Sequence, residues 1–78
     1  MNEELKLFLE RMIKSELKWM YHYDIDSEMF GIETDRYSYA KRVLDGDTAI
    51  ENMISHFERF YPNDEADLIH HLKFLASI

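Results

Sequence analysis

The feature that most constrains the fold is a helical period of apolar residues that recurs along most of the chain. Early in the sequence, apolar side chains return at steps of three and four residues, as at Leu5, Leu9 and Met12. This spacing places them on one face of an α-helix. The same period returns between residues 50 and 61 and again from residue 68 onward. A chain with this pattern buries helix faces against one another, which predicts an all-α fold.

The length limits this fold to a small single-domain bundle. At 78 residues the chain holds one core, because two cores would leave each half too small for burial to outweigh its surface. One helical domain over residues 1–78 is therefore expected, with an ordered acidic loop after a long first helix. The four predicted helices lie at about 2–23, 35–45, 48–61 and 64–77.

Residues that favour helix ends mark these boundaries. Asn2 and Thr34 can each cap the start of a helix, and Thr48 begins a capping-box pattern with the glutamate three residues later. Gly46 suits the left-handed backbone that often follows a helix, and Pro62 ends a helical run. The predicted boundaries rest on these five positions.

Composition excludes several classes of protein. Without cysteine the chain has neither a disulfide framework nor a thiolate metal site. A hydrophobic content of 46% is too high for a disordered acidic tail. Charges interrupt the N-terminal segment every few residues, and no run approaches the roughly 20 apolar residues of a membrane span. We therefore expect a cytoplasmic location and no membrane partner.

The net charge of −7 is concentrated in one segment. Residues 1–23 are neutral and residues 36–44 carry +3, whereas residues 24–35 hold five acids without a base. Most other acids stand at helix starts, where the helix dipole favours them. We expect an ordered loop over residues 24–35, with a short extended or hairpin-like segment as the alternative.

An aromatic run leads directly into this acidic loop. Successive helical residues cannot all face one core, so at least one of the large rings is expected to be exposed. Tyr and Trp are enriched in binding hot spots, and neighbouring acids steer a basic partner. The alternative is that the rings pack under the loop and close a small core. The predicted partner-binding residues are Trp19, Tyr21, Tyr23, Asp24, Asp26, Glu28, Glu33 and Asp35.

The acidic loop and the four histidines are candidates for metal binding or acid–base chemistry. Four acids of the loop fall at liganding positions of an EF-hand, but the sixth position, which needs glycine, holds Met29. The histidines form no H-x-x-x-H or E-x-x-H pair, and adjacent His70 and His71 point about 100° apart on a helix. The sequence therefore predicts no catalytic residue, no metal site and no cofactor.

A dimeric helical DNA-binding transcriptional regulator is the alternative function. Residues 30–54 bear a weak similarity to a helix-turn-helix, with Arg36, Lys41 and Arg42 on the helix, over residues 36–42, that would contact DNA. The segment is longer than the usual tight unit, and the neighbouring acids oppose phosphate. We therefore expect no direct contact with nucleic acid, and expect these bases to neutralise the acidic loop within the fold.

Small size, acidity and the lack of a catalytic set are typical of small phage- or mobile-element-type proteins that occupy a site on a larger protein, sometimes as nucleic-acid mimics. We therefore predict a non-enzymatic protein-binding module, an inhibitor in style, whose partner presents a basic, nucleic-acid-binding surface. Self-association is a separate expectation. The first helix carries more apolar surface than three short helices cover, with Leu7 off its main face, which predicts a homodimer through that helix.

Overall fold

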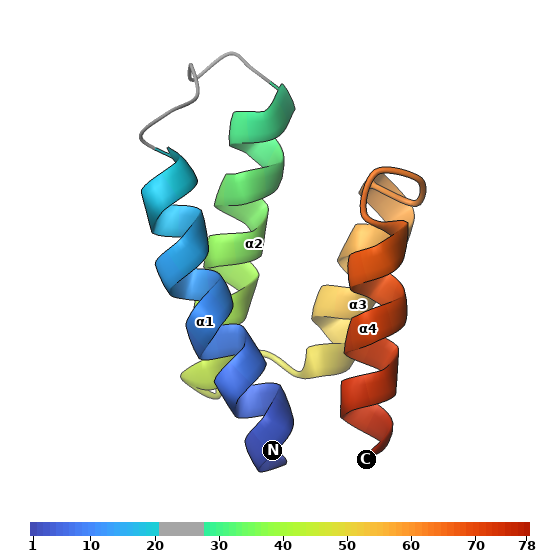
Figure 1. Ribbon diagram of the computed structural model, residues 1–78. Helices are drawn as coiled ribbons and strands as arrows, with labels where there is room; N and C mark the ends of the chain where they lie inside the picture. Colours follow the sequence, from blue (N-terminus) through green and yellow to red (C-terminus); the bar gives the residue numbers. More distant parts are fainter. Residues whose placement is uncertain (21–27) are drawn as a thin grey trace.

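The computed structural model describes residues 1–20 and 28–78 and confirms the all-α bundle of four helices. The helices are Glu3–Met20 (α1), Glu28–Leu44 (α2), Ile50–Phe60 (α3) and Ala66–Ser77 (α4). They form two antiparallel hairpins, α1 with α2 and α3 with α4, and both chain termini lie at one end of the domain (Figure 1). No helix within the described ranges is both long and apolar enough to cross a membrane.

α1 begins where the sequence predicts. Asn2 Oδ1 accepts a hydrogen bond from the backbone N–H of Leu5 at 2.8 Å, as a capping side chain does. The Asn2 side-chain amide also donates to the backbone carbonyl of Leu75 at 2.7 Å. One residue therefore caps α1 and ties its start to the last turns of α4.

α2 begins earlier than the sequence suggested. It starts at Glu28 rather than near residue 35, so the second half of the predicted acidic loop is helical. Thr34, expected to cap this helix, lies inside it. The predicted boundary of this helix is wrong by about two turns.

The inward face of α2 explains the difference. Ile32, Ala40 and Val43 are buried, and Arg36 occupies the position between Ile32 and Ala40. Because a charged residue interrupts the apolar series, hydrophobic spacing alone does not reveal that the helix extends back to residue 28. The end of α2 agrees with prediction, since Gly46 follows it with a φ of 81°.

The capping box expected at the start of α3 does not form. Ala49 takes the N-cap position without a side-chain hydrogen bond to the helix. Thr48 Oγ1 instead accepts a hydrogen bond from the Asn52 side-chain amide at 2.9 Å, so its oxygen serves a neighbouring side chain rather than the backbone. This predicted cap is therefore wrong, although the helix itself is present.

The core lies where the four helices meet. Phe57, Leu9, Met53 and Leu72 are fully enclosed, and burial of side chains of this size contributes about 1.5 to 3 kcal/mol each. Smaller side chains of α2 complete the contact. The buried apolar cluster comprises Leu5, Leu9, Met12, Ala40, Val43, Met53, Ile54, Phe57, Ile69, Leu72 and Leu75.

Three apolar residues that follow the predicted helical spacing lie at the surface instead. Leu17, Phe60 and Ile78 are all exposed, and each lies in or just after the last turn of its helix. At the level of Leu17, the inward position of α1 is held by Glu16, which is buried. The buried core therefore includes fewer residues than the apolar spacing predicts, and polar residues are buried in its place at one end of the bundle.

Candidate functional site

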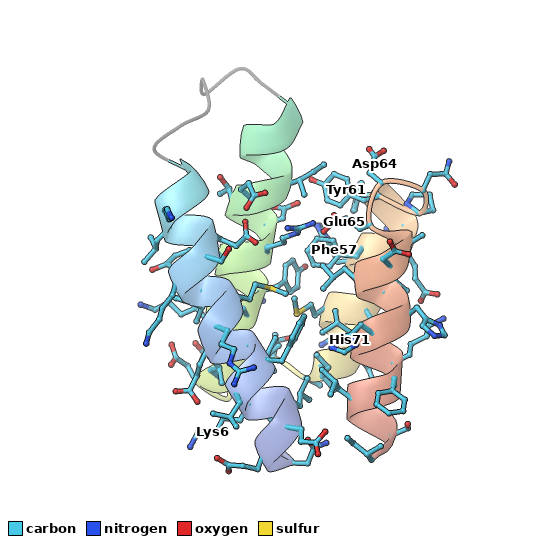
Figure 2. The ribbon with its side chains drawn as sticks, in the orientation of Figure 1. Lys6, Phe57, Tyr61, Asp64, Glu65 and His71 are labelled. Atoms are coloured by element: carbon cyan, nitrogen blue, oxygen red, sulfur yellow. The ribbon has the colours of Figure 1, made fainter. Side chains whose placement is uncertain are left out.

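Tyr61, Asp64 and Glu65 lie at the end of the bundle opposite the chain termini (Figure 2). Arg36, on α2, directs its guanidinium toward three carboxylates. Its Nε and Nη2 donate to the two oxygens of Glu65, which precedes α4, and the Nε bond is 2.5 Å long. Its Nη1 donates to Glu16 Oε1 at 3.1 Å and lies 3.7 Å from Glu33 Oε1. We call these four residues the Arg36 cluster.

The Arg36 cluster joins the two helical hairpins. Glu16 comes from α1, Glu33 and Arg36 from α2, and Glu65 from the connection between α3 and α4. The paired bonds to Glu65 use the planar fork of the guanidinium, which suits a carboxylate better than an ammonium does. The pairing therefore fixes how one hairpin sits against the other.

Negative charge is in excess within the cluster. The three carboxylates are only 3% to 4% exposed, yet they share one guanidinium. Among the described side chains, Glu16 Oε2 and Glu33 Oε2 are buried without a hydrogen-bond partner. An acceptor left in this state costs about 1 to 3 kcal/mol, so the fold retains this cluster at some expense of stability.

The pKa values reflect this imbalance. Burial raises the pKa of Glu33; nearby Arg36 opposes the rise and the charge of Glu65 adds to it. The hydrogen bonds to Glu65 raise the pKa of Arg36 above its usual range, so the guanidinium stays charged. Burial therefore favours the protonated form of Glu33.

A second polar contact joins α2 to α3. Asp35 Oδ2 accepts a hydrogen bond from the Tyr61 hydroxyl at 2.6 Å and lies 3.0 Å from His56 Nε2. The His56 ring lies against those of Tyr39 and Phe60, with centroids 4.6 and 4.8 Å away. A carboxylate beside an imidazole can exchange protons, but the surrounding rings leave this imidazole little surface for a substrate.

The structure describes the side chains of two predicted partner-binding residues. Glu33 belongs to the Arg36 cluster, and Asp35 pairs with His56 and Tyr61, so both have partners inside the domain. Their contribution to partner binding stays a prediction. The other six candidates lie outside the described residues or have side chains that are not described: Trp19, Tyr21, Tyr23, Asp24, Asp26 and Glu28.

The sequence predicts that Arg36 neutralises the acidic loop within the fold, and Glu33 of that segment is one of its three partners, but Glu16 and Glu65 were not expected. Leu5, Leu9 and Met12 form a series at steps of four and three, and the next step of four reaches Glu16. Arg36 holds the equivalent place on α2. Opposite charges at inward positions of two helices predict a buried ion pair. Glu65 lies in a turn, where no period marks it.

Among the described side chains, no group of three or more His, Cys, Asp or Glu residues is arranged to hold a metal ion. The calcium alternative depends on Asp24 and Asp26, which lie outside the described ranges. A scan against protein-family models and searches of curated proteins and of solved structures found no match to this chain. Its function is thus inferred from the geometry of its own residues.

Proposed function

We propose that the chain is a non-enzymatic protein-binding module that presents an acidic end to a basic partner. The observation that carries the proposal is the charge at the end opposite the termini. There, Asp35 and the Arg36 cluster set four carboxylates against one guanidinium. Lys18 and Arg59, in the last turns of α1 and α3, add two bases, and Asp64, in the turn after α3, adds one acid. The sequence between Met20 and Glu28 holds two acids and no base.

An excess of carboxylates in and beside a low-dielectric interior produces a field that salt screens less than it screens isolated surface charges. Such a field accelerates encounter with a partner rich in lysine and arginine. A nucleic-acid-binding surface has this chemistry, so the specific form proposed is an inhibitor of the small phage- or mobile-element type that mimics nucleic acid. As expected from the sequence, we also propose a cytoplasmic location, no cofactor and a homodimer.

The test removes charge from the acidic end without touching the buried carboxylates. In one variant, Asp24→Asn, Asp26→Asn and Glu28→Gln are combined. In the matched control, Asp45→Asn, Asp47→Asn and Glu51→Gln remove the same charge from exposed residues near the end that holds the termini. Both are compared with the unmodified chain for capture and titration of the partner identified by mass spectrometry from a lysate of the source organism.

We expect the first variant to bind its partner about ten-fold more weakly at low salt and with a flatter salt dependence. The control should retain both the affinity and the salt dependence. Equal affinities of the two variants, or a loss in the control as large as that in the first variant, would contradict the proposal.

The DNA-binding alternative depends on three bases of α2. Arg36 is engaged with carboxylates, whereas Lys41 and Arg42 are exposed, the latter with its guanidinium carbon 5.0 Å from the centre of the Tyr39 ring. A gel-shift assay against random duplex DNA at low salt separates the two functions, because nonspecific affinity is greatest there. The binding module gives no shift under these conditions.

A further inference from the structure

A second surface lies along α1 and α4, and two of its residues, Phe8 and Arg11, also line a hollow beside Arg36 and Glu16. Leu7 is 43% exposed, which is high for a large apolar side chain. Figure 2 shows His71 between the two helices, where the edge of its ring meets Phe8 with 4.7 Å between centroids. A hollow of about 350 Å³ opens at this place, and we call it the α1–α4 hollow. Its lining residues are Glu4, Leu7, Phe8, Arg11, His71 and Leu75.

The charges on the rim of the α1–α4 hollow are complementary to a second copy of the same surface. Glu4 lies one turn before the pair Leu7 and Phe8, and Arg11 lies one turn after it. When two α1 helices pair antiparallel about a two-fold axis at Leu7 and Phe8, Glu4 of each copy meets Arg11 of the other. A parallel pair would instead place like charges together. The charges therefore select the antiparallel arrangement.

The other exposed charges of α1 follow this polarity in part. Glu3 lies before Leu7 and Phe8 and Lys14 lies after them, as Glu4 and Arg11 do, whereas Lys6 and Glu10 lie on the opposite sides of the axis. The complementarity of the antiparallel pair therefore rests on Glu4 and Arg11.

Apolar surface accompanies these charges on α4. Phe74, one turn after His71, and Ile78 are each 55% exposed. Ile78 also shares a neighbouring hollow with Glu4. Exposed large side chains grouped beside a hollow and rimmed by charge are typical of an interaction surface.

We propose that the chain forms an antiparallel two-fold dimer in which the α1–α4 hollows of two copies meet. Leu7 and Phe8 of both copies form the centre, and two Glu4–Arg11 pairs close the rim. This dimer is independent of the partner binding proposed above, because neither Glu4 nor Arg11 belongs to the Arg36 cluster. Two-fold symmetry repeats every contact, so one substitution changes two contacts at once.

The test is a charge swap, followed by sedimentation of the full chain from micromolar to millimolar concentration. Glu4→Arg and Arg11→Glu are made singly and together. Each single change creates like-charge contacts and should weaken dimerisation by about ten-fold or more, whereas the double change restores opposite charges and should bring the affinity back to within about three-fold. Glu51→Arg and Arg59→Glu, at exposed positions of α3, serve as controls and should leave the dimer unchanged.

Circular dichroism on each variant confirms that the helices remain, since all four positions are exposed. The proposal is overturned if the unmodified chain is a monomer throughout the millimolar range. It is also overturned if the double variant dimerises as weakly as the single variants, or if the α3 controls lose as much affinity. Partner capture by the single variants should be unchanged, which separates this surface from the acidic end.

Discussion

Close to the chain termini and through the middle of the bundle, α1 and α4 meet through closely packed apolar side chains such as Leu5, Leu9 and Leu72. At the other end, the two hairpins meet through Arg36 and its three carboxylates. Truncating a buried apolar side chain lowers the free energy of unfolding by an amount that grows with the size of the cavity left behind. Removing a single partner from a buried charge cluster is strongly destabilising, because the remaining charges are left buried and unpaired.

The difference separates stability from specificity in this domain. Apolar contacts supply most of the free energy of folding, whereas a buried ion cluster contributes little net stability after desolvation. What the Arg36 cluster does supply is geometry: its bonds to Glu65 form only when the two hairpins are correctly placed, and its bond to Glu16 holds α1 against α2. The comparison can be tested by substitutions in each region.

The largest loss is expected from Phe57→Ala in the apolar region. Phe57 is fully buried, and its removal should lower the free energy of unfolding by about 4 kcal/mol, measured by urea denaturation. Phe60→Ala, three residues later on the same helix, is the control. Because Phe60 is 56% exposed, its loss should be below about 1 kcal/mol. Similar losses in the free energy of unfolding for Phe57→Ala and Phe60→Ala would show that burial in the apolar core does not determine the cost of the substitution.

Arg36→Met should follow, with a loss of about 3 kcal/mol at neutral pH. The variant leaves three buried carboxylates without a cation, while Arg42→Met, at an exposed position of the same helix, should cost less than about 1 kcal/mol. The measurement is again urea denaturation. If the two variants are equally stable, the Arg36 cluster does not hold the hairpins together.

Acid should partly rescue Arg36→Met. Arg36 opposes the rise that burial causes in the pKa of Glu33, so without the guanidinium the folded-state pKa of Glu33 should rise further above its unfolded value of about 4.3. At a pH between the unfolded and the folded pKa of Glu33, the folded variant binds more protons than the unfolded chain, so its stability should rise as the pH falls through the raised pKa. A deficit relative to the unmodified chain that stays constant from neutral pH downward would contradict this.

Asn2→Ala tests the apolar end, where polar contacts are few. It removes the bonds to Leu5 N–H and to the Leu75 carbonyl, and it should cost about 1 kcal/mol in thermal or urea unfolding. Thr48→Ala is the comparison. Since Thr48 does not cap its helix, the change there should stay within about 0.5 kcal/mol. A larger effect at Thr48 would show that the capping box forms in solution.

The smallest effect is expected from Glu33→Gln, and it is an effect on pH dependence. The raised pKa of Glu33 means that the folded state holds this proton more tightly than the unfolded state. Stability from this group is therefore full below the unfolded pKa and is lost as the pH rises through the raised folded pKa. The amide removes this slope and should change stability by about 1 kcal/mol or less at neutral pH.

The measurement is the unfolding midpoint followed from mildly acidic to neutral pH. Glu58→Gln is the control, because this exposed carboxylate pairs with Lys73 at the surface and should leave the slope in place. Identical slopes for Glu33→Gln and the unmodified chain would show that the pKa of Glu33 is the same in the folded and unfolded states.

Much of the fold could be predicted because the relevant information is local. The cap at Asn2, the left-handed Gly46 and the apolar spacing of α3 all act within a few residues of chain. The start of α2 could not be predicted in the same way. Its first turns carry acids, and the helix is held through contacts of Arg36 with Glu16 and Glu65, which belong to other segments.

The candidate site was predicted only in part. Charge counting by segment identified the acidic stretch, but it treated Glu33 and Asp35 as members of one exposed surface. In the structure these two side chains turn to different partners, Arg36 for the first and His56 with Tyr61 for the second. Tyr61 lies 26 residues from Asp35 in sequence, and no local pattern encodes a pairing at that separation.

The hydrogen bond between Asn2 and Leu75 has a mechanical consequence. Because α1 starts where α4 ends, a force that separates the two ends of the domain acts on the contact between these helices in an unzipping geometry (Figure 1). Contacts then break one after another from the termini upward, and each resists alone. The Asn2 bond should be the first to part and the Arg36 cluster the last, so the domain should yield to tension gradually.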